Sequence, residues 1–323
     1  MSILEKILPA EKNKRKWFSL GLTILFVTPL TIWGIYHIGE YGIALFILTP
    51  LFIGLSSTVL YGYQRKLTSI ESLKISFLTL GFFTLGLILF AIEGLICIAM
   101  AAPIGLFFTW IGGLIGLSIV NKKPSNSLTA ILILFITIPL TAFIEKENIP
   151  EIKPVITKVI INASPQTVWR NVVEFPQLDD PSEFIFKVGI AYPINATIKG
   201  KGVGAVRHCN FNTGSFVEPI TIWNEPHLLA FKVLEQPEPL KELSIWDIDA
   251  PHLHDYFVSK KGQFKLTRLP NGQTELEGTT WYYHNIKPDL YWRLWSDLII
   301  HNIHKRVLNH IKENSEKVTP NHQ

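Results

Sequence analysis

Two glutamates interrupt apolar, strand-like stretches of the C-terminal half and could do acid–base chemistry. Glu218 lies in the run FVEPITIW, and Glu277 lies in the run LEGTTWYY. A carboxylate on an apolar wall has a raised pKa and can act as a general acid or base. The alternative is a structural ion pair with Arg207, Arg268 or Arg293. The sequence leaves both interpretations open.

A second set of polar residues lies in a helical stretch near the C-terminus. Asp297 and His301 are four residues apart and His301 and His304 three apart, so their side chains are neighbours on a helix. The carboxylate could orient an imidazole for proton transfer, or the set could supply half of a metal site. It could equally be a structural network that faces the membrane domain or solvent. A metal would need further ligands, and nothing in the sequence brings His252 or His254 to this helix. We therefore expect no metal at these residues.

The elements that must carry these residues follow the order strand, helix, several antiparallel strands and a long final helix. Ser164 can cap a helix that begins at Pro165, and Pro270-Asn271-Gly272 predicts a hairpin turn. The final helix is expected from about Asp289 to Glu313. The predicted strands are Val155–Ile161, Gly204–Cys209, Ser215–Trp223, Leu228–Leu234, Asp255–Leu269 and Gln273–His284.

This layout, with the opening ASPQTVWRNVVEFPQL, resembles the SRPBCC superfamily, also called START-like or helix-grip, which includes polyketide cyclase/dehydrase-like proteins. The resemblance covers about residues 155–317. The segments EGLICIAMAAP and HLHDYFVSKKGQF further resemble membrane-anchored bacterial members. The resemblance implies an α+β domain in which a curved antiparallel sheet grips the last helix around a cavity for a lipophilic ligand. It does not imply one function, because this fold hosts carriers, enzymes and regulators.

Large aromatic side chains fall in segments that would border such a cavity. They could contact a ligand, or they could simply fill the core of the domain, and the sequence does not separate the two roles. The candidates are Trp223, Trp246, Trp281, Tyr283, Trp292 and Trp295.

The first 145 residues predict an all-α membrane domain, because a spanning helix needs about 20 mostly apolar residues. The predicted spans are residues 17–38, 41–63, 73–92, 101–120 and 128–144. Four spans with a re-entrant piece are the alternative. The charged, proline-containing residues 146–154 predict a linker, residues 155–317 the helix-grip domain and residues 318–323 a tail.

Basic residues predict the orientation of these spans, since Lys and Arg in short loops favour the cytoplasmic side. They cluster before the first span, between the second and third, and between the fourth and fifth, whereas the alternate connections hold none. Five spans in a bacterial inner membrane would place the N-terminus in the cytoplasm and the C-terminal domain outside it. Four spans would place that domain in the cytoplasm.

Glu93 is the one acidic residue set well inside apolar sequence. Carboxylates within a membrane are costly and often functional. The alternative places Glu93 at the turn between two spans, where Gly94 follows it and where it could cap a helix.

Charge and motifs narrow the function classes. Of 30 Lys and Arg residues, 10 precede Lys146, and of 26 Asp and Glu residues, 6 do, so the C-terminal half has 20 of each and no net charge. Such a domain lacks the positive patch of a nucleic-acid binder. The sequence also lacks P-loop, dinucleotide and HExxH motifs, so we expect no cofactor.

The sequence therefore predicts a membrane-tethered binding or carrier protein whose partners are the bilayer and a lipophilic small molecule, such as a lipid, quinone or polyketide-like compound. One alternative is a cyclase/dehydrase-like enzyme that uses Glu218, Glu277 or the Asp297–His301 pair. The other is a soluble domain that regulates the membrane helices.

Overall fold

The computed structural model describes residues 7–39, 41–122, 127–145, 150–242 and 250–317. The chain forms two compact units. The helical unit contains residues 1–149 together with the later segments Glu242–Pro251 and Ile286–Pro288. The C-terminal unit contains the rest of the chain from Pro150 onward.

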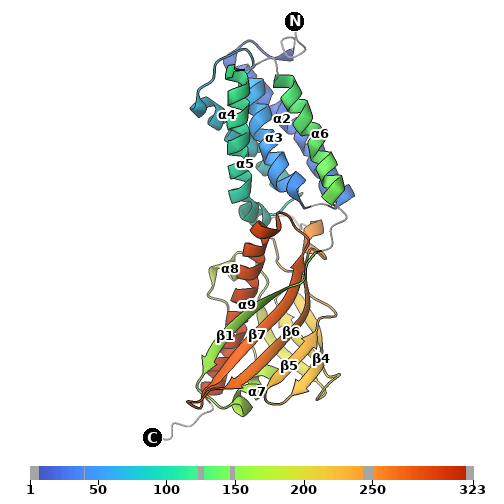
Figure 1. Ribbon diagram of the computed structural model, residues 1–323, viewed down its shortest axis with the longest axis vertical. Coiled ribbons are helices and arrows are strands. Elements are labelled where there is room, and N and C mark those ends of the chain that lie inside the picture. Colours follow the sequence, from blue (N-terminus) through green and yellow to red (C-terminus); the bar gives the residue numbers. More distant parts are fainter. Residues whose placement is uncertain (1–6, 40, 123–126, 146–149, 243–249, 318–323) are drawn as a thin grey trace. The chain divides into compact units, whose positions relative to one another are not determined.

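Among the described residues of the helical unit, five helical segments are long and apolar enough to cross a membrane. This number agrees with the predicted fold class, and the helices are coloured blue to green in Figure 1. The first segment is α2 (Lys12–Trp33) continued by the π-helix η1 (Gly34–Ile38), and the second is the π-helix η2 (Ala44–Leu48) continued by α3 (Thr49–Gly62). The others are α4 (Ser69–Leu89), α5 (Leu95–Lys122) and α6 (Ser127–Glu145).

Helix α3 is buried along nearly its whole length and packs closely on α5. A Cβ atom on Gly54 would meet the Thr109 carbonyl, and one on Gly112 would meet the Leu51 carbonyl, so glycine lets the two backbones touch. Small residues commonly allow such close approach between helices in membranes. The same helix uses Thr58 to bridge to α4, where its Oγ1 lies 3.1 Å from the Ser72 hydroxyl.

The C-terminal unit is built on a seven-stranded antiparallel sheet of order β1-β7-β6-β5-β4-β3-β2. Figure 1 shows its strong curvature. Gly272 has a φ of 84° in the predicted hairpin turn between β6 and β7, a conformation that suits glycine. The strands are β1 (Lys153–Ile161), β2 (Pro193–Lys199), β3 (Val206–Phe211), β4 (Gly214–Asn224), β5 (Leu228–Lys232), β6 (Phe257–Arg268) and β7 (Thr274–His284).

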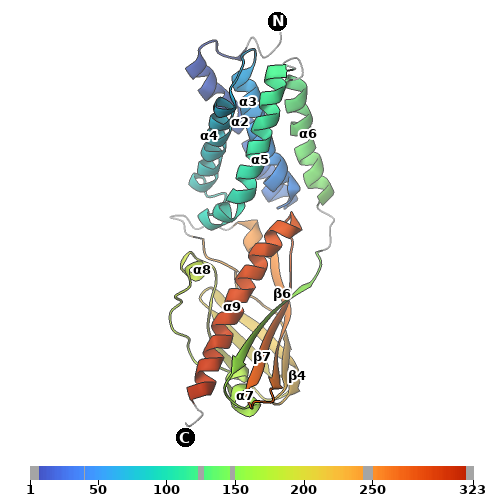
Figure 2. The same ribbon diagram turned by 60° about the vertical axis from the view of Figure 1, so that its left-hand side comes forward.

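The long helix α9 (Asp289–Lys317) packs against the sheet, as Figure 2 shows. Leu308 and Ile311 of α9 are fully buried in a core with Leu276 of β7 and with residues of α7 (Pro165–Val173). Ser164 caps α7 as predicted, since its hydroxyl accepts a hydrogen bond from the Thr167 amide. The short helices α8 (Phe184–Lys187) and η4 (Pro251–Leu253) complete the described elements.

This arrangement is the helix-grip fold, and the predicted fold class is confirmed. Strand β2 had no counterpart among the predicted strands. Its sequence PINATIK alternates weakly and begins with proline, so periodicity gave little signal.

Candidate functional site

A cavity of about 110 Å³ lies inside the C-terminal unit, between α9 and the sheet. One water needs roughly 10–15 Å³ of such space, so the cavity can hold a small organic molecule. Its walls come from β3 to β7, from the middle of α9 and from residues 233–239, which follow β5.

Phenyl rings and aliphatic side chains form most of the cavity wall. The rings belong to Phe211, Phe216, Phe231, Phe257 and Phe264, and α9 adds Ile299, Ile300, Ile303, Val307 and Leu308. Alternation along each strand sends every second side chain inward. A bulge between Ser259 and Lys261 shifts the alternation of side chains along β6, and Phe257 beyond it lines the cavity.

Arg207 and Glu218 form a buried ion pair at this wall. They lie directly opposite each other on β3 and β4, and their side chains are only 2% and 7% exposed. Arg207 donates through Nη1 to the Glu218 carboxylate and through Nε to the Val173 carbonyl at 3.2 Å. The rings of Phe175, Phe231 and Phe264 each lie 5.6 Å from the guanidinium carbon. Glu218 thus has the ion pair that was one of its two predicted roles.

Burial is the largest single influence on the pKa values of both residues of this pair. It raises the pKa of Glu218, although the neighbouring Arg207 opposes the change. Burial also disfavours the charged form of Arg207 and is the largest single influence on it, but Glu218 and Cys209 together outweigh burial and raise the pKa of Arg207. Cys209, next along the same face of β3, has its pKa raised to about 12, mainly by burial and then by Glu218. The thiol is therefore protonated and unreactive at neutral pH.

A chain of hydrogen bonds joins the cavity wall to α9. His304 Nε2 lies 2.8 Å from the Thr280 hydroxyl, and both residues line the cavity. His304 Nδ1 lies 3.0 Å from the Thr157 hydroxyl, which lies 2.8 Å from His301 Nδ1. Burial, and then the nearby His301, lower the pKa of His304 to about 4. His304 is thus a neutral imidazole at neutral pH.

Asp297 and His301 have different partners. The Asp297 carboxylate accepts a hydrogen bond of 2.6 Å from the Tyr282 hydroxyl, whereas His301 bonds to Thr157. Burial, followed by this bond to Asp297, raises the pKa of Tyr282. Among the residues of the C-terminal unit that the structure describes, no three acidic, histidine or cysteine side chains bring ligand atoms together around one point. The predicted pairing of Asp297 with His301 gains no support from this geometry.

Glu277 lies on the other side of β7. It pairs with Lys158 of β1 at 3.1 Å, and its neighbour Glu275 pairs with the same lysine at 3.0 Å. Glu277 is not among the residues that line the cavity, so its proposed acid–base role gains no geometric support.

The five predicted aromatic candidates that the structure describes are not among the residues that line the cavity. Trp223 packs on Trp169 with ring centroids 5.6 Å apart, and Lys261 and Lys260 lie over the rings of Trp281 and Tyr283. Trp292 is buried on α9, and Trp295 is half-buried on the same helix. Trp246 lies outside the described residues.

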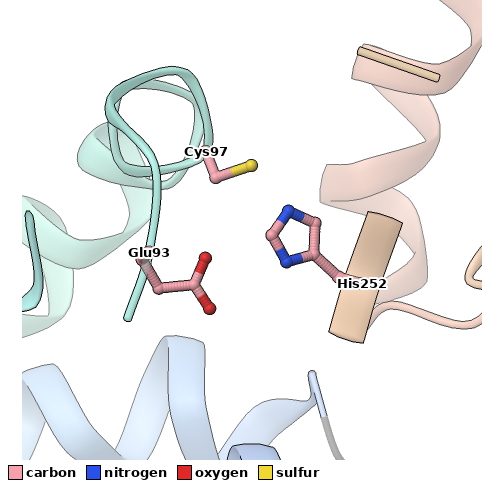
Figure 3. A group of neighbouring side chains, drawn as sticks. All are labelled: Glu93, Cys97 and His252. Carbon is pink, nitrogen blue, oxygen red and sulfur yellow. The ribbon is translucent and has the colours of Figure 1, made fainter. Parts of the chain in front are cut away.

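Glu93 lies between α4 and α5 and is buried within the helical unit. Its carboxylate accepts a hydrogen bond of 2.7 Å from the Tyr41 hydroxyl. Figure 3 shows Glu93 and Cys97 projecting to the same side of the segment that begins α5. The Ile96 and Cys97 amides at that helix start donate to Glu242, another member of this unit, at 3.0 and 3.3 Å. This distant carboxylate occupies the capping position that the sequence suggested for Glu93.

Gln236 helps to hold the wall segment, residues 233–239, against β6. Its side-chain amide donates to the Phe257 carbonyl at 2.7 Å, and its side-chain oxygen accepts from the Ser259 amide at 2.9 Å. One glutamine therefore satisfies two backbone groups of β6 at the point where that strand bulges.

Sequence reasoning missed Arg207 as a site residue in its own right, and also missed the cavity phenylalanines. The hairpin from β3 to β4 turns at Asn212 and Thr213, which places Arg207 opposite Glu218. A turn predicted at these two residues would have placed Arg207 opposite Glu218. The phenylalanines have the sequence pattern of ordinary core residues, and this pattern does not indicate that a cavity lies between their rings.

Comparisons with known proteins add a likeness in fold. No protein-family model matches the sequence, and no curated protein matches it. Solved structures similar to part of this chain include truncated norcoclaurine synthase from Thalictrum flavum, with 15% identity over 55% of this chain and 99% of that chain and a TM-score of 0.34. The Zhui aromatase/cyclase from Streptomyces sp. R1128 has 12% identity over 52% and 95%, with a TM-score of 0.33. The Aha1 dimer from Colwellia psychrerythraea has 16% identity over 51% and 96%, with a TM-score of 0.31.

Proposed function

We propose that the C-terminal unit binds a lipophilic small molecule, such as a lipid, quinone or polyketide-like compound, in the cavity between α9 and the sheet. The observation that carries this proposal is a cavity of about 110 Å³ inside the core, with mostly apolar walls and a few polar groups. Small-molecule sites commonly combine apolar walls with a small number of polar groups that fix the ligand's orientation.

In this proposal the helical unit anchors the binding unit to a bacterial inner membrane. Its five segments are long and apolar enough for that role. A poorly soluble ligand concentrates in the bilayer, and a tether keeps the binding unit near that source at a high effective concentration. The arrangement suits a carrier or a sensor for a membrane-dissolved compound.

The test fills the cavity in the full-length protein. Ile303→Trp adds an indole to the α9 wall, whereas Leu298→Trp makes the same kind of change on α9 at a residue that is 46% exposed. Both variants and the parent are purified in lipid nanodiscs, and bound compounds are identified by native mass spectrometry and extraction. We expect a co-purifying lipophile in the parent and in Leu298→Trp, but not in Ile303→Trp. An empty parent protein, or an Ile303→Trp protein that keeps the compound, would contradict the proposal.

An enzyme of the cyclase or dehydrase type is the second candidate, and the position of His304 favours it. This imidazole lines the cavity, and Thr157 connects it to His301. Such a chain can remove a proton from a ligand C–H group and pass it outward through reversed hydrogen bonds. Proton transfer of this kind typically contributes about 10²–10⁴-fold to a rate.

Hydrogen exchange tests this second candidate. The methyl protons next to the carbonyl of 2-acetonaphthone exchange slowly in D₂O, and mass spectrometry follows their replacement. An enzyme of this class should accelerate the exchange over empty nanodiscs, and His304→Gln should remove the acceleration while the ketone still binds. Exchange no faster than the background would leave the binding function without a catalytic one.

A further inference from the structure

The Arg207 guanidinium has an unused hydrogen-bond donor at the cavity wall. Its Nε and Nη1 groups have the Val173 carbonyl and the Glu218 carboxylate as acceptors. Its Nη2 group is buried and makes no hydrogen bond to an oxygen or nitrogen acceptor among the described residues, and the nearby Cys209 thiol is only a weak acceptor. Arg207 and Glu218 both line the cavity.

A buried donor without an acceptor is costly, because it has lost its hydrogen bonds to water. The penalty is larger for a charged group than for a neutral polar one. The surrounding Phe175, Phe231 and Phe264 rings face the guanidinium but supply no oxygen. A guest with an oxygen acceptor would remove the penalty, whereas a pure hydrocarbon would leave it in place.

The charge of the pair decides which oxygen fits. The guanidinium stays protonated at any physiological pH, and Glu218 contacts it directly, so the ionised pair has no net charge. A guest carboxylate would place a second negative charge beside Glu218 in an apolar site, where like charges repel strongly. A carbonyl oxygen can accept from Nη2 without adding charge.

We propose that the guest of this cavity is a neutral lipophile that presents a carbonyl oxygen to Nη2 of Arg207. The ligand class is therefore ketones, quinones and esters rather than free carboxylic acids. This inference rests on the proposed binding function and narrows it to one chemistry.

The test removes both charges together. Replacing Arg207 alone would leave Glu218 buried without a partner, which is strongly destabilising and could unfold the unit. Arg207→Met combined with Glu218→Met keeps similar volume, and such replacement of a whole buried pair is often tolerated. An unchanged unfolding temperature of the double variant establishes that the fold is retained.

Three probes of similar shape are compared on the full-length protein in nanodiscs, with empty nanodiscs as the background: 2-acetonaphthone, 2-ethylnaphthalene and 2-naphthoate. We expect the parent to bind the ketone roughly tenfold or more tightly than the hydrocarbon, the range for a hydrogen bond to a charged group. Naphthoate should bind more weakly than the ketone. In the double variant the ketone and the hydrocarbon should bind alike.

The outcomes distinguish a failure of the carbonyl assignment from a failure of the binding function. Equal binding of ketone and hydrocarbon by the parent, or tighter binding of naphthoate, would overturn the carbonyl assignment while leaving the binding function intact. A ketone preference that survives in the double variant would show that Arg207 is not its source. Failure of every probe to bind the parent would count against the binding function itself.

Discussion

His304 is a neutral imidazole at the cavity wall, and its protonation opposes folding. Its pKa falls from 6.5 to about 4, mainly through burial. The unfolded chain therefore binds a proton that the folded unit refuses. The resulting stability is fully present above pH 6.5 and is lost as the pH falls toward 4.

We expect the midpoint unfolding temperature of the C-terminal unit to decrease between pH 6.5 and pH 4, by an amount equivalent to a few kcal/mol at most. Tryptophan fluorescence of the protein in nanodiscs measures this unfolding temperature at each pH. His304→Gln should flatten this part of the pH profile, because the amide does not titrate. An identical slope in the variant and the parent would assign the acid sensitivity to other groups.

Helix packing in the helical unit depends on two glycines where α3 meets α5. Gly112→Ala would force a methyl group against the Leu51 carbonyl and push the helices apart. We expect a lower thermal unfolding midpoint, equivalent to a loss of about 1–3 kcal/mol for an overpacked contact. Gly105→Ala on the same helix is the matched control, since nothing lies within 4 Å of its added Cβ. Equal midpoints for the two variants would mean that the close approach does not limit stability.

The sequence predicted those elements whose signal is local. The Ser164-Pro165 cap, the Asn271-Gly272 turn and the apolar runs each follow from neighbouring residues. The cavity wall depends instead on which strands lie side by side and on one bulge in β6. The tryptophans and Tyr283 that the sequence offered as candidates gain no support from this cavity, and the smaller phenylalanines that line it were overlooked.

In the proposed function the whole molecule combines a membrane tether with a binding unit, and its orientation is also a prediction. Five spans and cytoplasmic basic loops would place the binding unit outside the cytoplasm. Single cysteines test this in a background where Cys97 and Cys209 are replaced by alanine. Asn271→Cys lies at an exposed hairpin, and Lys66→Cys lies in an exposed connection between α3 and α4.

A membrane-impermeant maleimide added to intact spheroplasts should label Asn271→Cys at once and Lys66→Cys only after permeabilisation. The reverse pattern would show that the binding unit faces the cytoplasm. Labelling of both sites in intact spheroplasts would rule out a single orientation.

The segment at residues 233–239 would affect how fast a bound compound enters and leaves the cavity. It is a connection rather than a regular element, yet it lines one side of the cavity. The two hydrogen bonds of Gln236 and the backbone hydrogen bonds of Val233, Leu234 and Glu235 hold it in place. A compound that exchanges past it must wait for those bonds to open, and the wait applies equally on arrival and on departure. Residence time would then be set by this stretch of chain, while the equilibrium preference is set elsewhere, so slow turnover of the occupant need not mean tight binding.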